Sequence, residues 1–434
     1  METIPRHFKT VVLDRAINIL ASIADLMIQM ELHFEHHLDE DRLNRAMDLI
    51  LDAEPVLGCR FVTRSFRPCW ERLEKTSRRN FEFVSSREAY EFFKKGSIDP
   101  YLGPQVRACL WRKSEGDSLI LKVAHNVSDA GGLKETAAGI SRIYSRLAHE
   151  PEFVPDANTA GSRSVWQVMR HLPWHAYPQV LLYYFRKVLR NSIPLKTHTL
   201  PVEKTRTEGT TFALHHLPAG LVDQMMKYGK RNEGTLNDMI LAAMFRAYSS
   251  SADWNGDSQL RFLTTVDLRR YLPSGSAGGI CNLSAIENHH LGTDTGSGFN
   301  DTLLKVRKFT SSRKKNWIGF PDFLGVVPVL GHLPYRWLIG TGRKIAGLSM
   351  KADNMPNGIT NMGLIDPSSI IFDKAPGKAW LLVPPSLPPQ FVTGISGYRG
   401  TLTLSAGFEK ESMKQVTPHD LFDTITEELM EVTS

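Results

Sequence analysis

His125 is the residue whose type and setting most clearly indicate chemistry. It ends an apolar run in which Leu119, Leu121 and Val123 recur at every second position, so a β-strand would place the imidazole on their face. Asp129 follows four residues later, and an apolar repeat with helical spacing begins after two glycines. An imidazole held between two packed elements can act as a general base near neutral pH. The segment therefore predicts a base in a short, rigid turn.

The spacing His-x-x-x-Asp carries little information by itself, because it occurs four times in the sequence. The pairs that begin at His37, His290 and His419 lie at a helix start, in a Gly/Thr/Ser-rich loop and in a polar C-terminal helix. The pair at His125 alone follows an apolar strand and precedes a Gly-Gly turn. The structural alternative is that His125 lies at the edge of the core and its ring hydrogen-bonds a backbone carbonyl.

Residues 124–130 read Ala-His-Asn-Val-Ser-Asp-Ala and resemble the HHxxxDG signature of an acyltransferase superfamily. That superfamily contains chloramphenicol acetyltransferase, nonribosomal peptide condensation domains, plant-type alcohol acyltransferases and wax ester synthases. The second histidine and the aspartate match, whereas Ala124 and Ala130 replace the first histidine and the glycine. Members that keep only HxxxD are active, so the resemblance implies that His125 is catalytic.

Five other segments resemble segments of the same superfamily in the same order. They are residues 57–62, 235–245, 266–274, 278–283 and 360–364. The resemblance implies an α/β (α+β sandwich) fold with two chloramphenicol acetyltransferase-like domains and an active-site tunnel between them. We expect residues 1–160 to form the N-terminal domain with the HxxxD motif, 161–205 a connector with an amphipathic helix, and 206–434 the C-terminal domain. A length of 434 residues also favours two domains.

The resemblance also implies how the catalytic loop is held. The motif aspartate, Asp129, points away from the histidine and pairs with an arginine, and Gly131 belongs to the same structural loop. The superfamily arginine on the early strand corresponds to Gly58. Arg60 and Arg269 are therefore the candidate partners, and an ordinary surface role is the alternative for each.

A tetrahedral intermediate of acyl transfer needs a preorganised donor for its oxyanion. Thr393 and Ser396, in the run Phe-Val-Thr-Gly-Ile-Ser-Gly, are candidate oxyanion or substrate contacts, with structural turn roles as the alternative. Asn361, in a segment that resembles a family loop, is a third candidate. No nucleophile elbow or Cys/His pair is present, so we expect no acyl-enzyme.

Local patterns predict elements in both halves of the chain. A strand at 27–36, a helix capped by Asp39, a strand at 81–86, a helix at 87–96 and a hairpin of 105–113 with 118–125 are expected in the first half. In the second half, Thr235 and Asp238 form a capping box, and 261–268 and 401–408 are expected strands.

An aromatic and basic stretch, Trp166–Arg190, follows the polar connector residues 149–165. It predicts a helix that either lies on a lipid surface or covers an apolar substrate, or else packs one domain on the other. The apolar residues of Phe320–Leu348 either line an acyl channel or fill the second core.

The charge balance favours anionic partners. There are 52 Lys+Arg against 46 Asp+Glu, a formal net charge of +6, although such an excess is also ordinary surface variation. The expected co-substrate is a thioester of coenzyme A or of the phosphopantetheine on an acidic acyl carrier protein. Either is anionic and would fit a basic face of the protein. Scattered basic residues without an aromatic–basic motif argue against nucleic acid. We expect no tightly bound cofactor.

Composition and termini indicate an ordinary globular protein, with 42% hydrophobic and 23% charged residues. The N-terminus lacks the apolar run of a signal peptide, and the uncharged residues 379–398 contain four prolines, which predicts a strand and loop instead of a membrane helix. Peripheral membrane contact stays open. Sparse cysteines predict no disulfide and no metal site. We expect a cytoplasmic monomer.

These observations predict an acyltransferase that moves an acyl group from a thioester to an alcohol or amine, with His125 as general base. An amide-forming condensation enzyme is a close mechanistic alternative. A non-catalytic scaffold that binds a carrier protein is the alternative from another class, because Ala124 and Gly58 depart from the family pattern.

Overall fold

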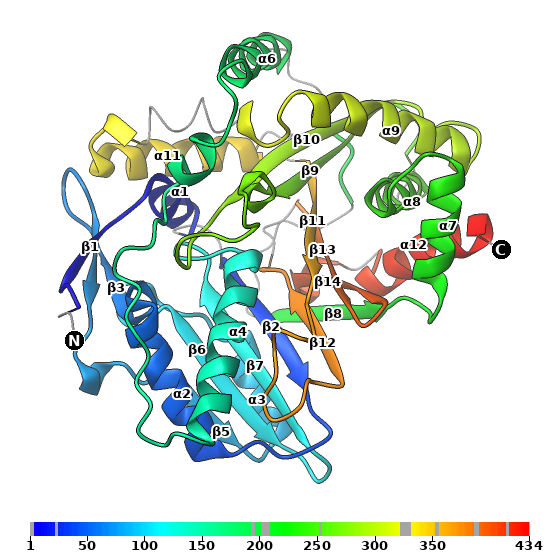
Figure 1. The fold of residues 1–434 in the computed structure, drawn as a ribbon. Helices are drawn as coiled ribbons and strands as arrows, with labels where there is room; N and C mark the ends of the chain where they lie inside the picture. The colour runs from blue at the N-terminus through cyan, green and yellow to red at the C-terminus, as the bar shows by residue number, and fades with distance from the viewer. Residues whose placement is uncertain are drawn as a thin grey trace.

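Two β-sheets, each covered by helices, organise the chain into two lobes in the computed structural model (Figure 1). The structure describes residues 4–21, 25–191, 196–200, 209–250, 254–321, 331–351, 356–385, 390–413 and 416–433.

The first lobe is built on a sheet with the strand order β12-β2-β7-β6-β5. Its strands are β2 (Met27–His33), β5 (Phe81–Val84), β6 (Val106–Arg112), β7 (Asp117–Ala124) and β12 (Lys378–Leu382). Leu119 and Leu121 of β7 share a core with residues of α2 (Glu40–Ala53) and α4 (Ala130–Leu147), whereas Ile120 packs with α3 (Arg87–Lys95). The predicted Asp39 cap, the helix at 87–95 and the antiparallel β6–β7 pair are confirmed.

The second lobe is built on a sheet with the order β10-β9-β11-β13-β14-β8. Its strands are β8 (Thr210–His216), β9 (Leu260–Asp267), β10 (Ser284–Gly292), β11 (Asn357–Leu364), β13 (Val392–Tyr398) and β14 (Thr401–Glu409). The helices packed on it are α7 (Leu221–Arg231), α8 (Leu236–Ser250), α9 (Phe299–Lys315) and α12 (Pro418–Thr433). Thr235 and Asp238 form the predicted capping box at the start of α8.

One strand crosses between the lobes. β12 comes late in the chain, yet it pairs antiparallel with β2, and the nearby Ile365, Ile370 and Phe372 lie in the first core. The division of the chain at 160 and 206 stays a prediction, and residue 206 itself lies outside the described residues. The predicted strand and loop at 379–398 correspond to parts of β12 and β13, while Pro388 and Pro389 lie outside the described residues.

Smaller elements complete the molecule. They are a sheet β1 (His7–Lys9), β4 (Cys69–Arg72) and β3 (Cys59–Val62), and helices α1 (Val12–Ala21), α5 (Trp166–Met169), α6 (Ala176–Asn191) and α11 (Tyr335–Lys351). Short 3-10 turns occur at Pro55–Gly58, Lys75–Ser77, Leu268–Tyr271 and Lys410–Ser412. The predicted helix at 166–190 is therefore two helices, separated by a segment that contains Pro173, which cannot donate a backbone hydrogen bond. Figure 1 shows α6 standing away from the body.

Candidate active site

His125 lies in the turn that joins β7 to α4, where the sequence placed it. Its backbone N–H donates to the Leu26 carbonyl at 3.2 Å, which continues the β2–β7 pairing by one residue. Asp129 caps α4 by accepting from the Gly132 N–H at 2.8 Å. The imidazole is partly buried and is held between a strand end and a helix start.

The hydrogen bond of Nδ1 sets the tautomer of His125. Nδ1 lies 2.8 Å from the Ser128 carbonyl oxygen. Since a carbonyl only accepts, Nδ1 carries the proton, and Nε2 of the neutral ring has a free lone pair. Among the described residues none hydrogen-bonds Nε2. The structural alternative predicted a hydrogen bond between the ring and a backbone carbonyl, and Nδ1 makes one. That bond leaves Nε2 available as a base.

The surroundings of His125 keep the ring neutral. Burial lowers its pKa below the ordinary value, and this effect outweighs the Ser128 carbonyl and the Asp129 carboxylate, which raise it. A neutral imidazole at physiological pH can accept a proton, which is the property required of a general base.

Asn282 contacts the same turn from the second half of the chain. Its amide nitrogen lies 3.2 Å from the His125 carbonyl oxygen and 3.3 Å from Nδ1. Because Nδ1 already donates to Ser128, the carbonyl is the acceptor. The Asn282 side-chain oxygen accepts from the Ser284 N–H at 3.0 Å, which fixes the amide orientation. Asn282 lies in the segment 278–283 that resembles the superfamily, but no role was predicted for its side chain.

Asp129 points away from the imidazole and binds Arg269, which follows β9. Nη1 of Arg269 lies 2.9 and 2.8 Å from the two carboxylate oxygens, and both side chains are almost fully buried. The Leu283 N–H also donates to Asp129, at 2.6 Å. These contacts join the start of α4 to two segments of the second half.

Arg269 is surrounded by further acceptors. Its Nε lies 3.1 Å from Glu135 of α4, and its Nη2 donates to the Cys281 carbonyl at 2.9 Å. Burial lowers the pKa of Arg269, but Asp129 and Glu135 outweigh it and raise the pKa. Burial by itself would raise the pKa of Asp129. Arg269 and two backbone N–H donors outweigh burial and lower the pKa, so the carboxyl stays ionised.

The two glycines after the motif are required because neighbouring side chains leave no room for a Cβ atom. A Cβ on Gly131 would lie 2.6 Å from Arg269 Nη1, and one on Gly132 would lie 2.2 Å from Ser128 Oγ. Gly131 is thus the position over which the guanidinium passes. Glycine here provides room for the ion pair; neither residue has a positive φ.

Several predicted contacts lie elsewhere. Arg60 is not the partner of Asp129, because it is on an exposed face of β3 and pairs with Glu71. Thr393 is buried in the second lobe, near Tyr248. Ser396 accepts from the Leu381 N–H of β12 at 3.1 Å. The Ser396 hydroxyl thus ties β12 to β13, and the role of both hydroxyls as oxyanion or substrate contacts stays a prediction.

Asn361 is exposed and hydrogen-bonds residues other than His125, so its role as a substrate contact stays a prediction. Its side-chain oxygen accepts from the Gly363 N–H at 3.0 Å, and its nitrogen donates to Asn237 at 3.2 Å. Beside it, Lys134 of α4 donates to the carbonyls of Met362 and Leu364, at 2.9 and 3.2 Å. The segment ties the two lobes together by these contacts.

Arg163 is a site residue that sequence reasoning missed. It lies in the polar stretch assigned to the connector, yet it donates to both oxygens of the buried Asp14, to Val127 O and to Ile280 O. It therefore holds the His125 turn against α1 and the 278–283 segment. Composition alone gave no signal for this, because the surrounding residues are typical of a linker.

A cavity of about 710 Å³ lies beside this network, between α2, α4 and residues 276–280. Glu135 lines it and His125 does not, so a tunnel that reaches the imidazole stays a prediction. Burial raises the pKa of Glu54 at its wall. Within the part of the chain that the structure describes, no three His, Cys, Asp or Glu side chains are placed to hold a metal ion.

Comparison with solved structures shows the same architecture along the whole chain. The trichothecene 15-O-acetyltransferase from Fusarium sporotrichioides is 11% identical with a TM-score of 0.71, and the alignment covers 98% of this chain and 95% of that one. The first condensation domain of the calcium-dependent antibiotic synthetase is 13% identical with a TM-score of 0.69, over 98% and 97%. The polyketide synthase associated protein 5 from Mycobacterium tuberculosis is 14% identical with a TM-score of 0.66, over 98% and 99%.

The chain has the two-lobed fold of condensation domains and chloramphenicol acetyltransferase-like acyltransferases. The fold class that the sequence predicted, and the resemblance at the level of the fold, are thereby confirmed. No protein family model matches the sequence. No curated protein matches it either.

Proposed function

We propose that this protein is an acyltransferase that moves an acyl group from a thioester to an alcohol or an amine, with His125 as general base. The observation that carries this is the imidazole geometry. Nδ1 is fixed on Ser128 O, the ring is neutral and Nε2 is available, within a fold that solved acyltransferases share.

The reaction needs one base and no covalent intermediate on the protein. The acceptor hydroxyl or amine gives its proton to Nε2 as its oxygen or nitrogen attacks the thioester carbonyl carbon. The carbonyl electron pair moves to oxygen and returns as the carbon–sulfur bond breaks. The thiolate then takes the proton from Nε2, so His125 ends neutral.

The donor would be acyl-coenzyme A or an acyl group on the phosphopantetheine of a carrier protein. Both are co-substrates that leave as thiols. Among the similar structures, one is named an O-acetyltransferase and others are condensation domains, so the names support either acceptor class. His125 would serve ester and amide formation equally, because either acceptor must lose a proton as it attacks.

Thiol release from a panel of acyl thioesters, with and without alcohols and amines, tests the proposal. We expect acceptor-dependent release that falls ~100-fold to ~10,000-fold in His125→Ala, the range for loss of a general base. His419→Ala is the matched control, since His419 has the same His-x-x-x-Asp spacing and is exposed. Wild-type turnover in His125→Ala would refute the assignment. No release with any pairing would favour the scaffold that binds a carrier protein.

A further inference from the structure

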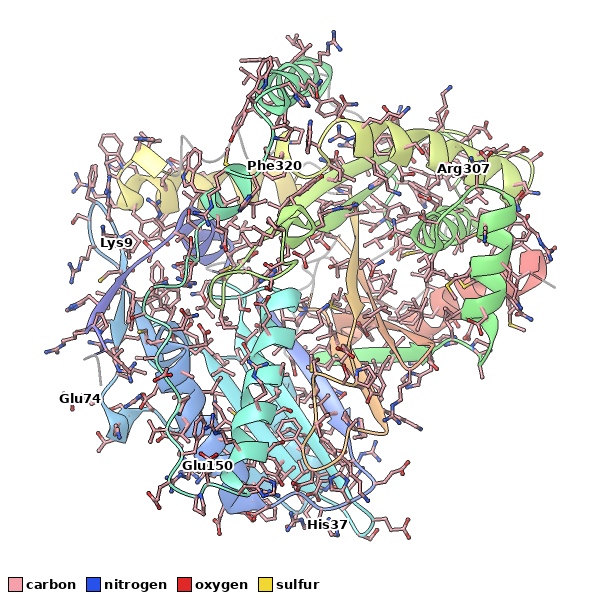
Figure 2. The ribbon with its side chains drawn as sticks, viewed as in Figure 1. Lys9, His37, Glu74, Glu150, Arg307 and Phe320 are labelled. Atoms are coloured by element: carbon pink, nitrogen blue, oxygen red, sulfur yellow. The ribbon has the colours of Figure 1, made fainter. Side chains whose placement is uncertain are left out.

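α6 leaves most of its apolar side chains uncovered. Its first turn is anchored, because Ala176 and Val180 pack in a cluster with α5 and with Phe320, which Figure 2 labels below the helix. Beyond this anchor Tyr183 packs against Arg313 of α9, and Figure 2 shows the helix and its remaining side chains standing away from the body. The exposed large apolar residues of α5, α6 and their connection include Trp166, Trp174, Tyr177, Leu181, Leu182, Phe185 and Leu189, with Trp174 82% and Leu189 74% exposed. The interpretation that this stretch packs one domain on the other therefore holds for α5 and for the side of α6 that carries Ala176, Val180 and Tyr183.

A second exposed group, the aromatic–arginine patch, lies where α11 begins. Residues 335 and 336 donate backbone hydrogen bonds to the carbonyls of Phe66 and Ser65 in the β3–β4 loop. This contact brings together six exposed side chains: Arg64, Phe66, Arg67, Leu333, Arg336 and Trp337. Phe66 is 54% and Trp337 59% exposed. Three arginines thus surround three large apolar side chains.

The two groups are neighbours, because α1 contacts the base of both. Val12 and Leu13 at the start of α1 pack against the α5–α6 cluster, and α1 also packs on α11. Figure 1 shows α6 and α11 along the same upper edge of the molecule. A single flat partner can therefore reach both groups.

The charge on this edge has one sign. Residues 157–202 contain no Asp or Glu, and neither do residues 323–352. Arg170 and Arg186 are exposed beside the apolar residues of α5–α6. Exposed apolar groups of this extent mark a binding surface, and the surrounding arginines specify an anionic one.

We propose that this edge of the protein, α5–α6 together with the aromatic–arginine patch, binds the surface of an anionic membrane. Tryptophan, phenylalanine and leucine next to arginine are the side chains that insert at the boundary between lipid headgroups and acyl chains. Within the described residues no helix combines the length and the apolar character needed to cross a bilayer. The protein lies on the surface by this interaction, and the proposal holds whether or not His125 is catalytic.

The surface lies close to the catalytic turn. Asn126, next to His125, donates to Asn18 of α1 at 3.2 Å, and Asn18 donates to Tyr335 of α11 at 2.8 Å. Trp337 is two residues further along α11. The hydrogen bonds therefore run from the turn to the buried start of α11, two residues before the exposed Trp337.

Sedimentation of the full-length protein with vesicles tests the proposal. We expect binding to phosphatidylcholine vesicles that contain about 30% phosphatidylserine, weaker binding in high salt, and little binding to phosphatidylcholine alone. Each arginine near an anionic surface is worth about fivefold in affinity, so Arg64→Glu/Arg67→Glu should bind at least ~25-fold more weakly. Phe185→Ser/Leu189→Ser should also lose binding. Arg87→Glu/Phe92→Ser on α3 is the matched control and should bind like wild type.

Three results would overturn the proposal. Wild-type protein that stays in the supernatant with anionic vesicles excludes the membrane. Variants of both groups that sediment like wild type place the lipid contact elsewhere. A concentration-dependent dimer in light scattering that Phe185→Ser/Leu189→Ser abolishes, without vesicle binding, makes a second copy the occupant. Because every altered side chain is exposed, unchanged circular dichroism and thermal unfolding are expected and rule out misfolding as the cause.

Discussion

Replacing Arg269 by methionine removes the charge that neutralises Asp129. Both side chains are 5% exposed, so the variant leaves an uncompensated buried carboxylate with backbone donors alone. Breaking a buried ion pair in this way costs about 3–5 kcal/mol in the free energy of unfolding. Glu135 and the Cys281 carbonyl also lose their donor, which places the expected cost toward the upper end.

Urea denaturation measures this loss, with Arg60→Met as the matched control. Arg60 also pairs with a glutamate, but its side chain is 46% exposed, and exposed pairs contribute roughly 0–1 kcal/mol. We expect the midpoint of Arg269→Met to shift strongly and that of Arg60→Met to shift little. Arg269→Lys should fall between them, because one ammonium cannot reach Asp129, Glu135 and Cys281 O together.

The loss of stability in Arg269→Met should depend on pH in a predictable direction. The folded-state pKa of Asp129 is lowered, so the stability from its ionised form is present above the unfolded pKa, near 3.8, and is lost as pH falls through the folded pKa. The gap between wild type and Arg269→Met should therefore be full near pH 7.5 and smaller near pH 4, where the carboxyl of the variant takes up a proton. Equal midpoints for Arg269→Met and Arg60→Met, or a gap that widens in acid, would refute this reasoning.

Three more predictions concern the same loop. Gly131→Ala should cost about 1–3 kcal/mol, because its Cβ would displace the Arg269 guanidinium, whereas Gly103→Ala, which meets nothing within 4 Å, should be near neutral in the same urea assay. The kcat/KM for acyl transfer should fall in acid with a midpoint below 6.5, since the pKa of His125 is lowered; a midpoint above 6.5 would contradict the neutral base. Asn282→Asp should move that midpoint upward, because a carboxylate beside the imidazole favours its charged form, and an unchanged pH profile would show that residue 282 does not face the ring.

Local contacts were predictable from sequence because they close within a few residues. The Asp39 cap, the Thr235 capping box and the β6–β7 hairpin follow from residue types at fixed short spacings. The placement of His125 follows in the same way from an alternating apolar strand and a Gly-Gly turn. Each of these features is stabilised by interactions within one short segment of the chain.

Long-range contacts were not predictable, because nothing local distinguishes them. Arg269 lies 140 positions from Asp129, and Arg60 was an equal candidate until the fold placed it beside Glu71. Arg163 was assigned to a linker, although it holds the turn through Asp14 and Val127. These pairings come from how the lobes meet, and residue types alone do not specify that.

The uncovered face of α6 shows a related limit. A helical repeat of apolar residues predicts that one face will be covered, but it does not say by what. In Trp166–Arg190 the chain covers the first turn of α6 and leaves Phe185 and Leu189 exposed. The same pattern at α4 is covered by the sheet and by α2. Tertiary structure is needed to tell these two outcomes apart.

Two departures from the family pattern, Ala124 in the motif and Gly58 on the early strand, can be explained by packing. Ala124, in place of the first histidine, is 1% exposed and lies in the first core, apart from the hydrogen bonds that orient the His125 ring. At Gly58 a Cβ would lie 3.0 Å from Leu51 O and 3.1 Å from Leu51 Cβ, so an arginine would have to displace the end of α2. Arg269 supplies the missing charge from the second lobe. The turn that carries His125 is therefore held from across the interface between lobes, which means that the first lobe by itself would lack the cation that orders Asp129.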